Sequence, residues 1–540
     1  MIENRHKSNI LILSLIVLFL ALSIRIYFIS QKSGLHVDEM FTISISRCNN
    51  YGWLIHPESG VIFRGDTLKT RILNDFRLDK GSGLLQDLKK LRENNFYDKA
   101  HPSLYYSLFR IWTINVNNFD LQKIIFYGCS LNLLFFLFSF FIMYKLLIRL
   151  FGDNKLVPIG LAAAFLNTGT ISMTLFVRPY ELQTLSLILL SYIFVIYFEK
   201  ITRKENMVSI KDCATLLSVL CLGFLSAYFT VIYIFIFGFI LIFVAIKNRQ
   251  FKSLLFLFIN VLGALIFAWL IYNGYFDLLG SQRISEARGA LMKDTNRLFK
   301  NVMVSFGGVI YIYTNFIFYV PIYLILLYCL SRLHRNKKPL TSQITLILVF
   351  LVFGGSIAIM SVSELKILRY VAPTFPIVSI LIPYNLSLLD KYQRNVCACL
   401  VIGIYIVYAI LATSIEGNDT DIKSPSSQKI PFGAKIQNLS LTDYNFKSVR
   451  DSGLPVIVVY HYWLEYLYII PHLDDKQIYI MMNLSALKNP QLEVNNLFEK
   501  YRHCYLLRTK EVPILPNNKR IKVLKSFNCN HFTCNELMLK

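Results

Sequence analysis

Long apolar runs recur along most of the chain and are separated by short polar links. Each run holds about 20 mostly apolar residues, the length that a helix needs to cross a bilayer at about 1.5 Å rise per residue. Eleven runs fit, at residues 9–29, 122–148, 156–176, 180–198, 210–227, 229–246, 252–273, 304–330, 342–362, 370–389 and 394–414. The pattern predicts a polytopic α-helical membrane protein with about 11 transmembrane helices.

The short links differ in charge between the two sides of the predicted membrane. Links on one side carry eighteen Lys and Arg residues, and those on the other side carry eight. Because cytoplasmic loops are enriched in Lys and Arg, the N-terminus is predicted to be cytoplasmic. The first apolar run is too long for a signal peptide, so we expect it to be a retained anchor. An odd number of spans then places the C-terminal tail outside.

Two long polar segments are therefore predicted to be extracytoplasmic. Residues 31–121 are predicted to form a first loop with surface helices. The part of this loop between Cys48 and Lys99 is strongly charged and has little apolar surface to pack. We therefore expect it to be a mobile lid. Residues 415–540 form a tail, predicted to be a small α/β domain that follows a transmembrane domain over residues 1–414. Strand-like patterns lie at Val456–Tyr460, Ile478–Met482, Cys504–Leu507 and Ile521–Leu524, and helical ones at Trp463–Ile470 and Leu492–Tyr501.

Composition supports the membrane class. Apolar residues make up 55% of the 540 residues, charged residues only 16%, and the mean hydropathy is +0.48. A soluble domain has roughly 45–50% apolar and 25% charged residues, so a soluble fold and a disordered chain are both excluded. The net charge of +23 is explained by the Lys and Arg excess of the predicted cytoplasmic links. The expected partner is therefore the lipid bilayer and not a nucleic acid.

Adjacent carboxylates follow the first span. Asp38 and Glu39 lie within about ten residues of its end, and a helix bundle does not need such a pair. Their chemical use would be to accept a proton from a nucleophile or to hold a divalent metal ion, with Asp38 as the possible ligand. Ordinary interfacial loop charge is the alternative.

Three further polar clusters map to the same predicted membrane face. They are His101-Pro102-Ser103-Leu104-Tyr105-Tyr106, Arg178-Pro179-Tyr180-Glu181, and Glu364 with Lys366 and Arg369-Tyr370-Val371-Ala372-Pro373. Each cluster alone is also typical of aromatic anchors and snorkelling charges. Together, carboxylates and Arg or Lys at one interface favour a substrate with a phosphate headgroup and an apolar tail.

In this order the motifs resemble the GT-C superfamily of integral-membrane glycosyltransferases. The branch with protein O-mannosyltransferases and lipid A aminoarabinose transferases is the most similar, through Val37-Asp38-Glu39, His101-Pro102, Arg178-Pro179-Tyr180 and Arg369-Tyr370-Val371-Ala372-Pro373. The resemblance covers roughly residues 9–414. Ser103 stands where the family usually has a second Pro, and Pro179 is an unusual middle residue for its Arg-x-Tyr motif.

The resemblance implies transfer of a sugar from a polyprenyl-phosphate or polyprenyl-diphosphate donor to a hydroxyl of a lipid, glycan or protein. It also implies a location in a bacterial inner membrane with the active site on the exterior face. Asp38 and Glu39 would be the catalytic residues, and inversion by single displacement is expected; Glu181 is the only loose candidate for a covalent route. Arg369, assisted by Lys366 or Arg178, would bind the lipid phosphate. The predicted substrate-binding residues are His101, Tyr105, Arg178, Tyr180, Glu181, Lys366, Arg369 and Tyr370.

Rival interpretations remain open at this point. A transporter or flippase of lipid-linked saccharides would carry charge near the bilayer midplane and internal repeats, and neither is evident. A polymerase or ligase would share the substrate chemistry. The tail holds His503, Cys504, Cys529, His531 and Cys534, whose spacing favours a disulfide among the three Cys, with the pairing open, over a zinc site. No phosphate-binding Gly loop, nucleophile elbow or HExxH motif is present.

Overall fold

The computed structural model describes most of the chain and divides it into two compact units. The described residues are 2–32, 34–47, 62–73, 83–95, 102, 104–116, 121–152, 155–205, 209–272, 295–331, 340–363, 368–412, 444–460, 469–483, 500–509, 521–529 and 532–539. One unit, here the helical unit, comprises Met1–Gln31, Lys99–Tyr105 and Cys129–Leu439. The other, the sheet unit, comprises Lys32–Asp98, Tyr106–Gly128 and Ser440–Lys540.

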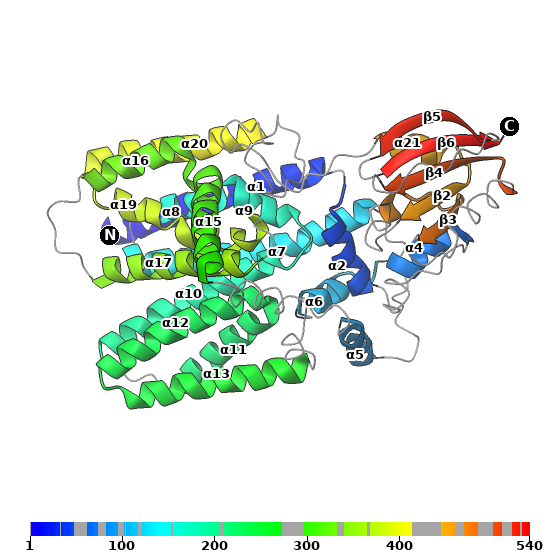
Figure 1. The fold of residues 1–540 in the computed structure, drawn as a ribbon. Coiled ribbons are helices and arrows are strands. Elements are labelled where there is room, and N and C mark those ends of the chain that lie inside the picture. Colours follow the sequence, from blue (N-terminus) through cyan, green and yellow to red (C-terminus); the bar gives the residue numbers. More distant parts are fainter. Residues whose placement is uncertain are drawn as a thin grey trace. The chain divides into compact units, whose positions relative to one another are not determined.

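The helical unit holds the long apolar helices (Figure 1). Within the described residues, eight spans are long and apolar enough to cross a membrane, or nine if the bent pair α8 (Leu156–Phe165) and α9 (Thr168–Leu175) counts as one span. The eight consist of α1 (Ile2–Gln31), α7 (Leu121–Phe151, in this unit from Cys129), α10 (Tyr180–Thr202), α12 (Tyr228–Lys247), α13 (Phe251–Ile271), α15 (Thr295–Tyr313) continued by η2 (Thr314–Phe318) and α16 (Tyr319–Ser331), α17 (Leu340–Val362) and α20 (Lys391–Ala412). These helices confirm a polytopic membrane protein.

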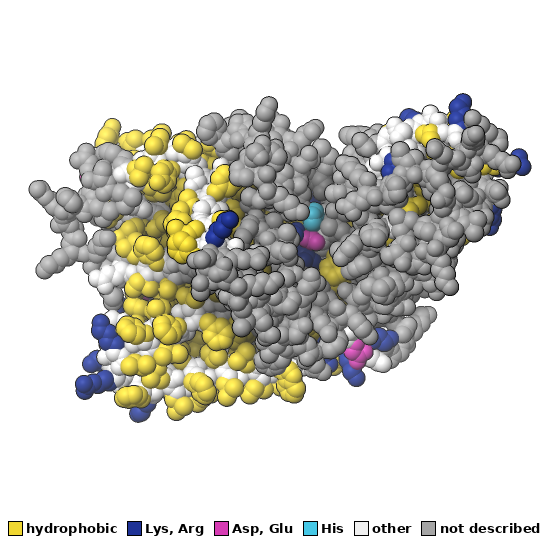
Figure 2. Space-filling model, viewed as in Figure 1, with side chains coloured by type: hydrophobic (Ala, Val, Ile, Leu, Met, Phe, Trp, Pro, Cys, Tyr) yellow, Lys and Arg dark blue, Asp and Glu magenta, His cyan; other side chains and the backbone are white. Residues whose placement is uncertain are grey.

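Two of the eleven predicted spans take a shorter form. The run at 210–227 forms α11 (Ile210–Ser226), and the run at 370–389 is broken into η3 (Leu368–Tyr370), η4 (Ala372–Thr374), α18 (Phe375–Val378) and α19 (Leu381–Leu386). Figure 2 shows hydrophobic side chains gathered over the helices of this unit. Phe235 and Phe239 of α12 and Phe258 of α13 are among the exposed ones, which is the surface expected of helices in lipid.

The predicted span at 156–176 is a broken helix. It consists of α8 (Leu156–Phe165) and α9 (Thr168–Leu175), bent by 53°. Asn167 makes the break possible, because its Nδ2 donates to the carbonyls of Ala163 (2.9 Å) and Ala164 (3.0 Å) while its Oδ1 accepts from the backbone N–H of Thr170 (2.8 Å). One amide thus satisfies the end of α8 and caps the start of α9, as a helix break in a bilayer requires.

Helix α9 packs tightly on the broken segment that follows Arg369. The Phe375 ring of α18 lies so close to Gly169 of α9 that any Cβ at this glycine would collide with it. Thr374 is fixed as well, because the Tyr313 hydroxyl lies 2.8 Å from its Oγ1. Two segments that are distant in the sequence, each carrying a predicted phosphate-binding arginine, are therefore packed together within the helical unit.

The sheet unit combines four helices of the first loop with the tail. The helices are α2 (Val37–Arg47), α4 (Gly65–Leu73), α5 (Leu84–Asn95) and α6 (Leu104–Trp112, in this unit from Tyr106); the tail adds α21 (Tyr444–Asp451) and η7 (Ile470–His472). The strands are β1 (Ile62–Arg64), β2 (Val456–Tyr460), β3 (Ile478–Asn483), β4 (His503–Thr509), β5 (Ile521–Cys529) and β6 (Phe532–Leu539), in the order β1-β3-β2-β4-β6-β5. The central strand β2 is buried along its whole length and parallel to both neighbours, whereas the remaining pairs are antiparallel.

The four predicted strands of the tail are confirmed. The sequence did not indicate β6, nor β1, which comes from the first loop and pairs with β3. The expectation that the charged part of this loop has little apolar surface to pack is wrong, because Leu68, Ile72 and Leu91 of α4 and α5 are fully buried. The predicted domain boundary at residues 414–415 lies outside the described residues, as do residues 463–468 of the predicted helix Trp463–Ile470 and residues 492–499 of the predicted helix Leu492–Tyr501.

The predicted disulfide does not involve Cys504. This residue is a free thiol, buried in the core of the sheet beside Ile457 and Leu506, and burial raises its pKa to about 12. The strand register explains the result, because Cys504 of β4 lies opposite Leu537 whereas Cys534 of β6 lies opposite Leu507. The side chains of Cys529 and His531 lie outside the described residues.

The sheet unit is expected to lose stability in mild acid through His472. Burial, together with the charges of Arg450 and Lys69, lowers the pKa of His472 from 6.5 to about 4. The folded state therefore favours the neutral ring, so this contribution is complete above pH 6.5 and is lost as the pH falls toward 4. The loss is of the order of 3 kcal/mol. Hydrogen exchange of the β2 amides at several pH values measures it, and an unchanged acid dependence in His472→Gln would contradict it.

Candidate functional site

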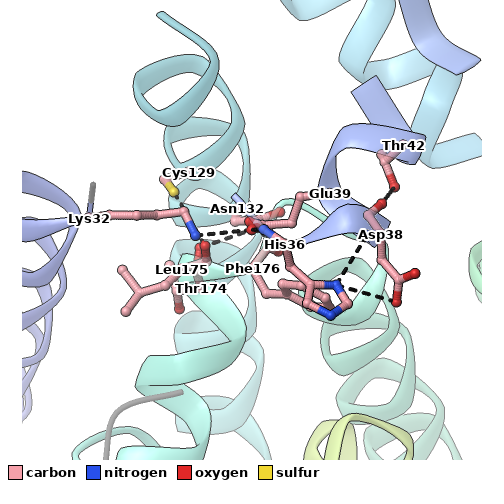
Figure 3. A network of polar contacts seen from close by, with 10 residues as sticks. All are labelled: Lys32, His36, Asp38, Glu39, Thr42, Cys129, Asn132, Thr174, Leu175 and Phe176. Atoms are coloured by element: carbon pink, nitrogen blue, oxygen red, sulfur yellow. Dashed lines mark hydrogen bonds and ion pairs between the residues drawn. The ribbon is translucent and has the colours of Figure 1, made fainter. Parts of the chain in front are cut away.

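Asp38 and Glu39 lie in the first turn of helix α2, and two hydrogen-bond donors hold the Glu39 carboxylate in place. The Oε2 atom of Glu39 accepts from the backbone N–H of His36 (2.7 Å) and from Nζ of Lys32 (3.1 Å), as Figure 3 shows. The first bond is one half of a capping box, in which the third helical residue reaches back to the residue before the helix. The Lys32 and Glu39 side chains are both 0% exposed. Glu39 therefore fixes the start of α2.

Asp38 has a different environment from its neighbour. Its side chain is 25% exposed, and its Oδ2 lies 3.7 Å from Nδ1 of His36. The backbone N–H of Asp38 donates to that same nitrogen (3.1 Å), so Nδ1 is the acceptor and the neutral ring carries its proton on Nε2 (Figure 3). Asp38 is thus the member of the pair whose carboxylate can reach a substrate.

Helix α2 is also anchored at its far end. Arg47 is buried and donates to the carbonyls of Thr113 and Val116, both at 2.9 Å, beyond the end of α6. A buried ion pair between Arg110 of α6 and Asp87 of α5 (3.1 Å) ties the next two helices together. A side chain that acts on a substrate needs such rigid support, because small displacements lower the reaction rate.

In the helical unit, the turn that carries Arg178 is bonded to helix α7. Asn132 Nδ2 donates to the carbonyls of Thr174 (3.2 Å) and Phe176 (2.7 Å), as Figure 3 shows. The Phe176 carbonyl also accepts from the backbone N–H of Arg178 (2.7 Å), which closes a three-residue turn. Arg178 itself is only 4% exposed.

Phe176 brings two of the predicted residues together. Its ring stacks on Tyr180 with the centroids 5.8 Å apart and an angle of 7°, and the guanidinium carbon of Arg369 lies 5.8 Å from its centroid. Tyr370, next to Arg369, packs edge-on against Phe229 at 4.9 Å. We call Phe176, Tyr180 and Arg369, together with Arg178, whose backbone N–H closes the turn on the Phe176 carbonyl, the Phe176 cluster.

A buried charge in the first span was not singled out from the sequence. Arg25 of α1 is 0% exposed; its Nε donates to Thr174 Oγ1 (2.9 Å) and its Nη1 to the carbonyl of Phe165 (2.9 Å). It thereby ties α1 to both halves of the broken span. Glu181 is also buried and accepts from the same Thr174 hydroxyl (3.4 Å). The sequence did contain a signal for Arg25, because an arginine inside an apolar run is costly unless it has a specific role.

The remaining predicted residues differ from expectation or are not described. Tyr105, predicted to bind substrate, is fully buried and its hydroxyl donates to Oδ1 of Asn132 (3.0 Å). His101, Glu364 and Lys366 lie outside the described residues. Sequence reasoning missed Lys32, His36, Asn132 and Phe176. For Lys32 and His36 the signal was closeness to the acidic pair, and for Asn132 it was an amide inside a predicted span.

The described residues contain no group of three or more His, Cys, Asp or Glu side chains placed to hold a metal ion. Around Asp38 they supply its own carboxylate and the His36 ring, since Glu39 is bonded to Lys32. A divalent metal at Asp38 therefore stays a prediction.

No protein-family model matches the chain, and no curated protein matches it. Solved structures do. ArnT from Cupriavidus metallidurans bound to undecaprenyl phosphate is similar with a TM-score of 0.51 at 9% identity, over 97% of this chain and 97% of that one. The same ArnT in the apo state gives 0.50 at 11% identity, with the same coverage. ArnT is a lipid A aminoarabinose transferase with the GT-C fold. The chain therefore has the GT-C fold of ArnT, which confirms the fold that the resemblance of the motifs implies.

Proposed function

We propose that this protein is a glycosyltransferase of the bacterial inner membrane. It moves a sugar from a polyprenyl-phosphate or polyprenyl-diphosphate donor to a hydroxyl of a lipid, glycan or protein on the extracytoplasmic face. The Phe176 cluster carries this proposal: the guanidinium of Arg369 lies over the ring of Phe176, two residues before the buried Arg178, in a bundle with the fold of ArnT, a protein solved with undecaprenyl phosphate. Arginine suits a phosphate headgroup, and the apolar helices suit its tail.

The reaction is a single displacement at the anomeric carbon of the sugar. The acceptor oxygen forms the new bond while the bond from that carbon to the donor phosphate oxygen breaks. Asp38 takes the hydroxyl proton, and Arg178 and Arg369 stabilise the negative charge that develops on the departing polyprenyl phosphate. Glu39, held by Lys32, keeps the first turn of α2 in place. The configuration at the anomeric carbon inverts.

Glu181 takes no covalent part in this scheme. A double displacement needs a second carboxylate as nucleophile against the sugar. Glu181 is 2% exposed and shares the Thr174 hydroxyl with Arg25. Its role in the proposal is to support the broken span that leads to Arg178.

Purified protein in lipid nanodiscs tests the function directly. Undecaprenyl-phosphate sugars that differ in the labelled sugar are supplied with a panel of lipid, glycan and protein acceptors. We expect label to move to an acceptor, with undecaprenyl phosphate released and the anomeric configuration inverted by NMR. In sealed vesicles, movement of the intact donor across the bilayer without sugar transfer would identify a flippase and overturn the proposal.

A further inference from the structure

The turn before Arg178 depends on one buried amide. Asn132 lies inside span α7 and is 0% exposed. A polar side chain in a span is costly unless every group is satisfied. Asn132 meets this condition, because Nδ2 donates to two carbonyls and Oδ1 accepts from the Tyr105 hydroxyl. The two carbonyls need a donor and the hydroxyl supplies one, so only one orientation of the amide fits.

The amide acts at the oxygen that closes the turn of Arg178. The Phe176 carbonyl accepts both from Asn132 Nδ2 (2.7 Å) and from the backbone N–H of Arg178 (2.7 Å). One residue earlier, the carbonyl of Leu175 receives the Cys129 thiol of the same α7 face at 3.6 Å (Figure 3). The backbone from Thr174 to Phe176 is thus bonded at three successive carbonyls to α7, directly before Arg178.

We propose that Asn132, held by Tyr105, is a positioning residue that sets the place of Arg178 for the donor phosphate. This inference rests on the proposed role of Arg178. Loss of the amide donor removes the bond between α7 and the Phe176 carbonyl, and the turn that leads to Arg178, then held only by its own backbone bond, can shift. A displacement of about 1 Å in a positioned group can cost 10²-fold.

The test is a double-mutant cycle in which the dissociation constant of undecaprenyl phosphate is measured for each variant in nanodiscs. Asn132→Asp puts an acceptor against the two carbonyls, and Asn132→Leu keeps the volume if the charged variant does not fold. We expect either change to weaken binding about 10–100-fold in the wild-type background, but less than about threefold in an Arg178→Met background, because both act through one group. Tyr105→Phe should weaken binding by a smaller factor. Undecaprenol, which lacks the phosphate, should bind all variants alike.

Asn260 provides a matched control. It is a buried amide in span α13, 2% exposed, that donates to the Phe256 carbonyl (2.8 Å) and accepts from Cys213. Asn260→Asp or Asn260→Leu should leave phosphate binding unchanged. Equal losses from the Asn132 change in both backgrounds, or an equal loss from Asn260, would overturn the positioning role. Full binding by Arg178→Met alone would instead contradict the proposed role of Arg178, and the inference would fall with it.

Discussion

Asp38→Asn is expected to lower the rate of sugar transfer by about 10²–10⁴-fold, the usual contribution of a general base. The amide has nearly the same shape as the carboxylate but cannot take the proton of the acceptor hydroxyl. The donor phosphate is assigned to arginines, so binding of undecaprenyl phosphate should stay within about twofold of wild type. The rate of single-turnover transfer and the dissociation constant, measured on the same preparation, separate the two effects.

Two substitutions control for changes that merely disturb a helix. Asp66 begins α4 of the same unit with its side chain 47% exposed, so Asp66→Asn should leave transfer unchanged. Glu39→Gln removes one charge of the buried pair with Lys32, which is expected to destabilise the unit by about 3–5 kcal/mol. Full activity in Asp38→Asn would remove this residue from the chemistry.

The difference between Asp38 and Glu39 shows what the sequence could not predict. The pattern after the first span predicted an acidic pair of catalytic use. Consecutive helical residues point about 100° apart, so the two carboxylates have different surroundings, but the dipeptide does not say which of them is buried. That choice depends on Lys32 and on the backbone of His36, whose contacts exist only once α2 has formed.

The apolar spans were predictable because bilayer thickness imposes a length and a composition. The break at Asn167 was not, since one amide barely changes the hydropathy of the run and its capping bonds are local geometry. Strand β1 has only three residues, too few for an alternating pattern. Tyr105 matched an aromatic anchor by residue type, whereas its buried bond to Asn132 comes from packing between distant segments.

Arg369→Met is expected to weaken binding of undecaprenyl phosphate about 10–100-fold and to slow transfer further, about 10²–10³-fold in total. A hydrogen bond to a charged group is worth about 1.5–3 kcal/mol, and 1.4 kcal/mol is tenfold. The loss in transfer exceeds the loss in binding because negative charge grows on the leaving phosphate. Methionine keeps the apolar contact with Phe176, over which the guanidinium lies.

Arg369→Lys separates charge from geometry. Lysine restores a positive charge but not two parallel donors, so it should recover part of the binding and less of the rate. Arg394, at the start of α20 and half-buried, is the control, and Arg394→Met should leave both quantities unchanged. Undecaprenol should bind the Met variant as it binds wild type, because Thr374 and Phe375 still hold the segment against Tyr313 and Gly169. If the Met variant bound the phosphate lipid with wild-type affinity, Arg369 would not be a phosphate ligand, and the Phe176 cluster would lose the observation that links it to a polyprenyl donor.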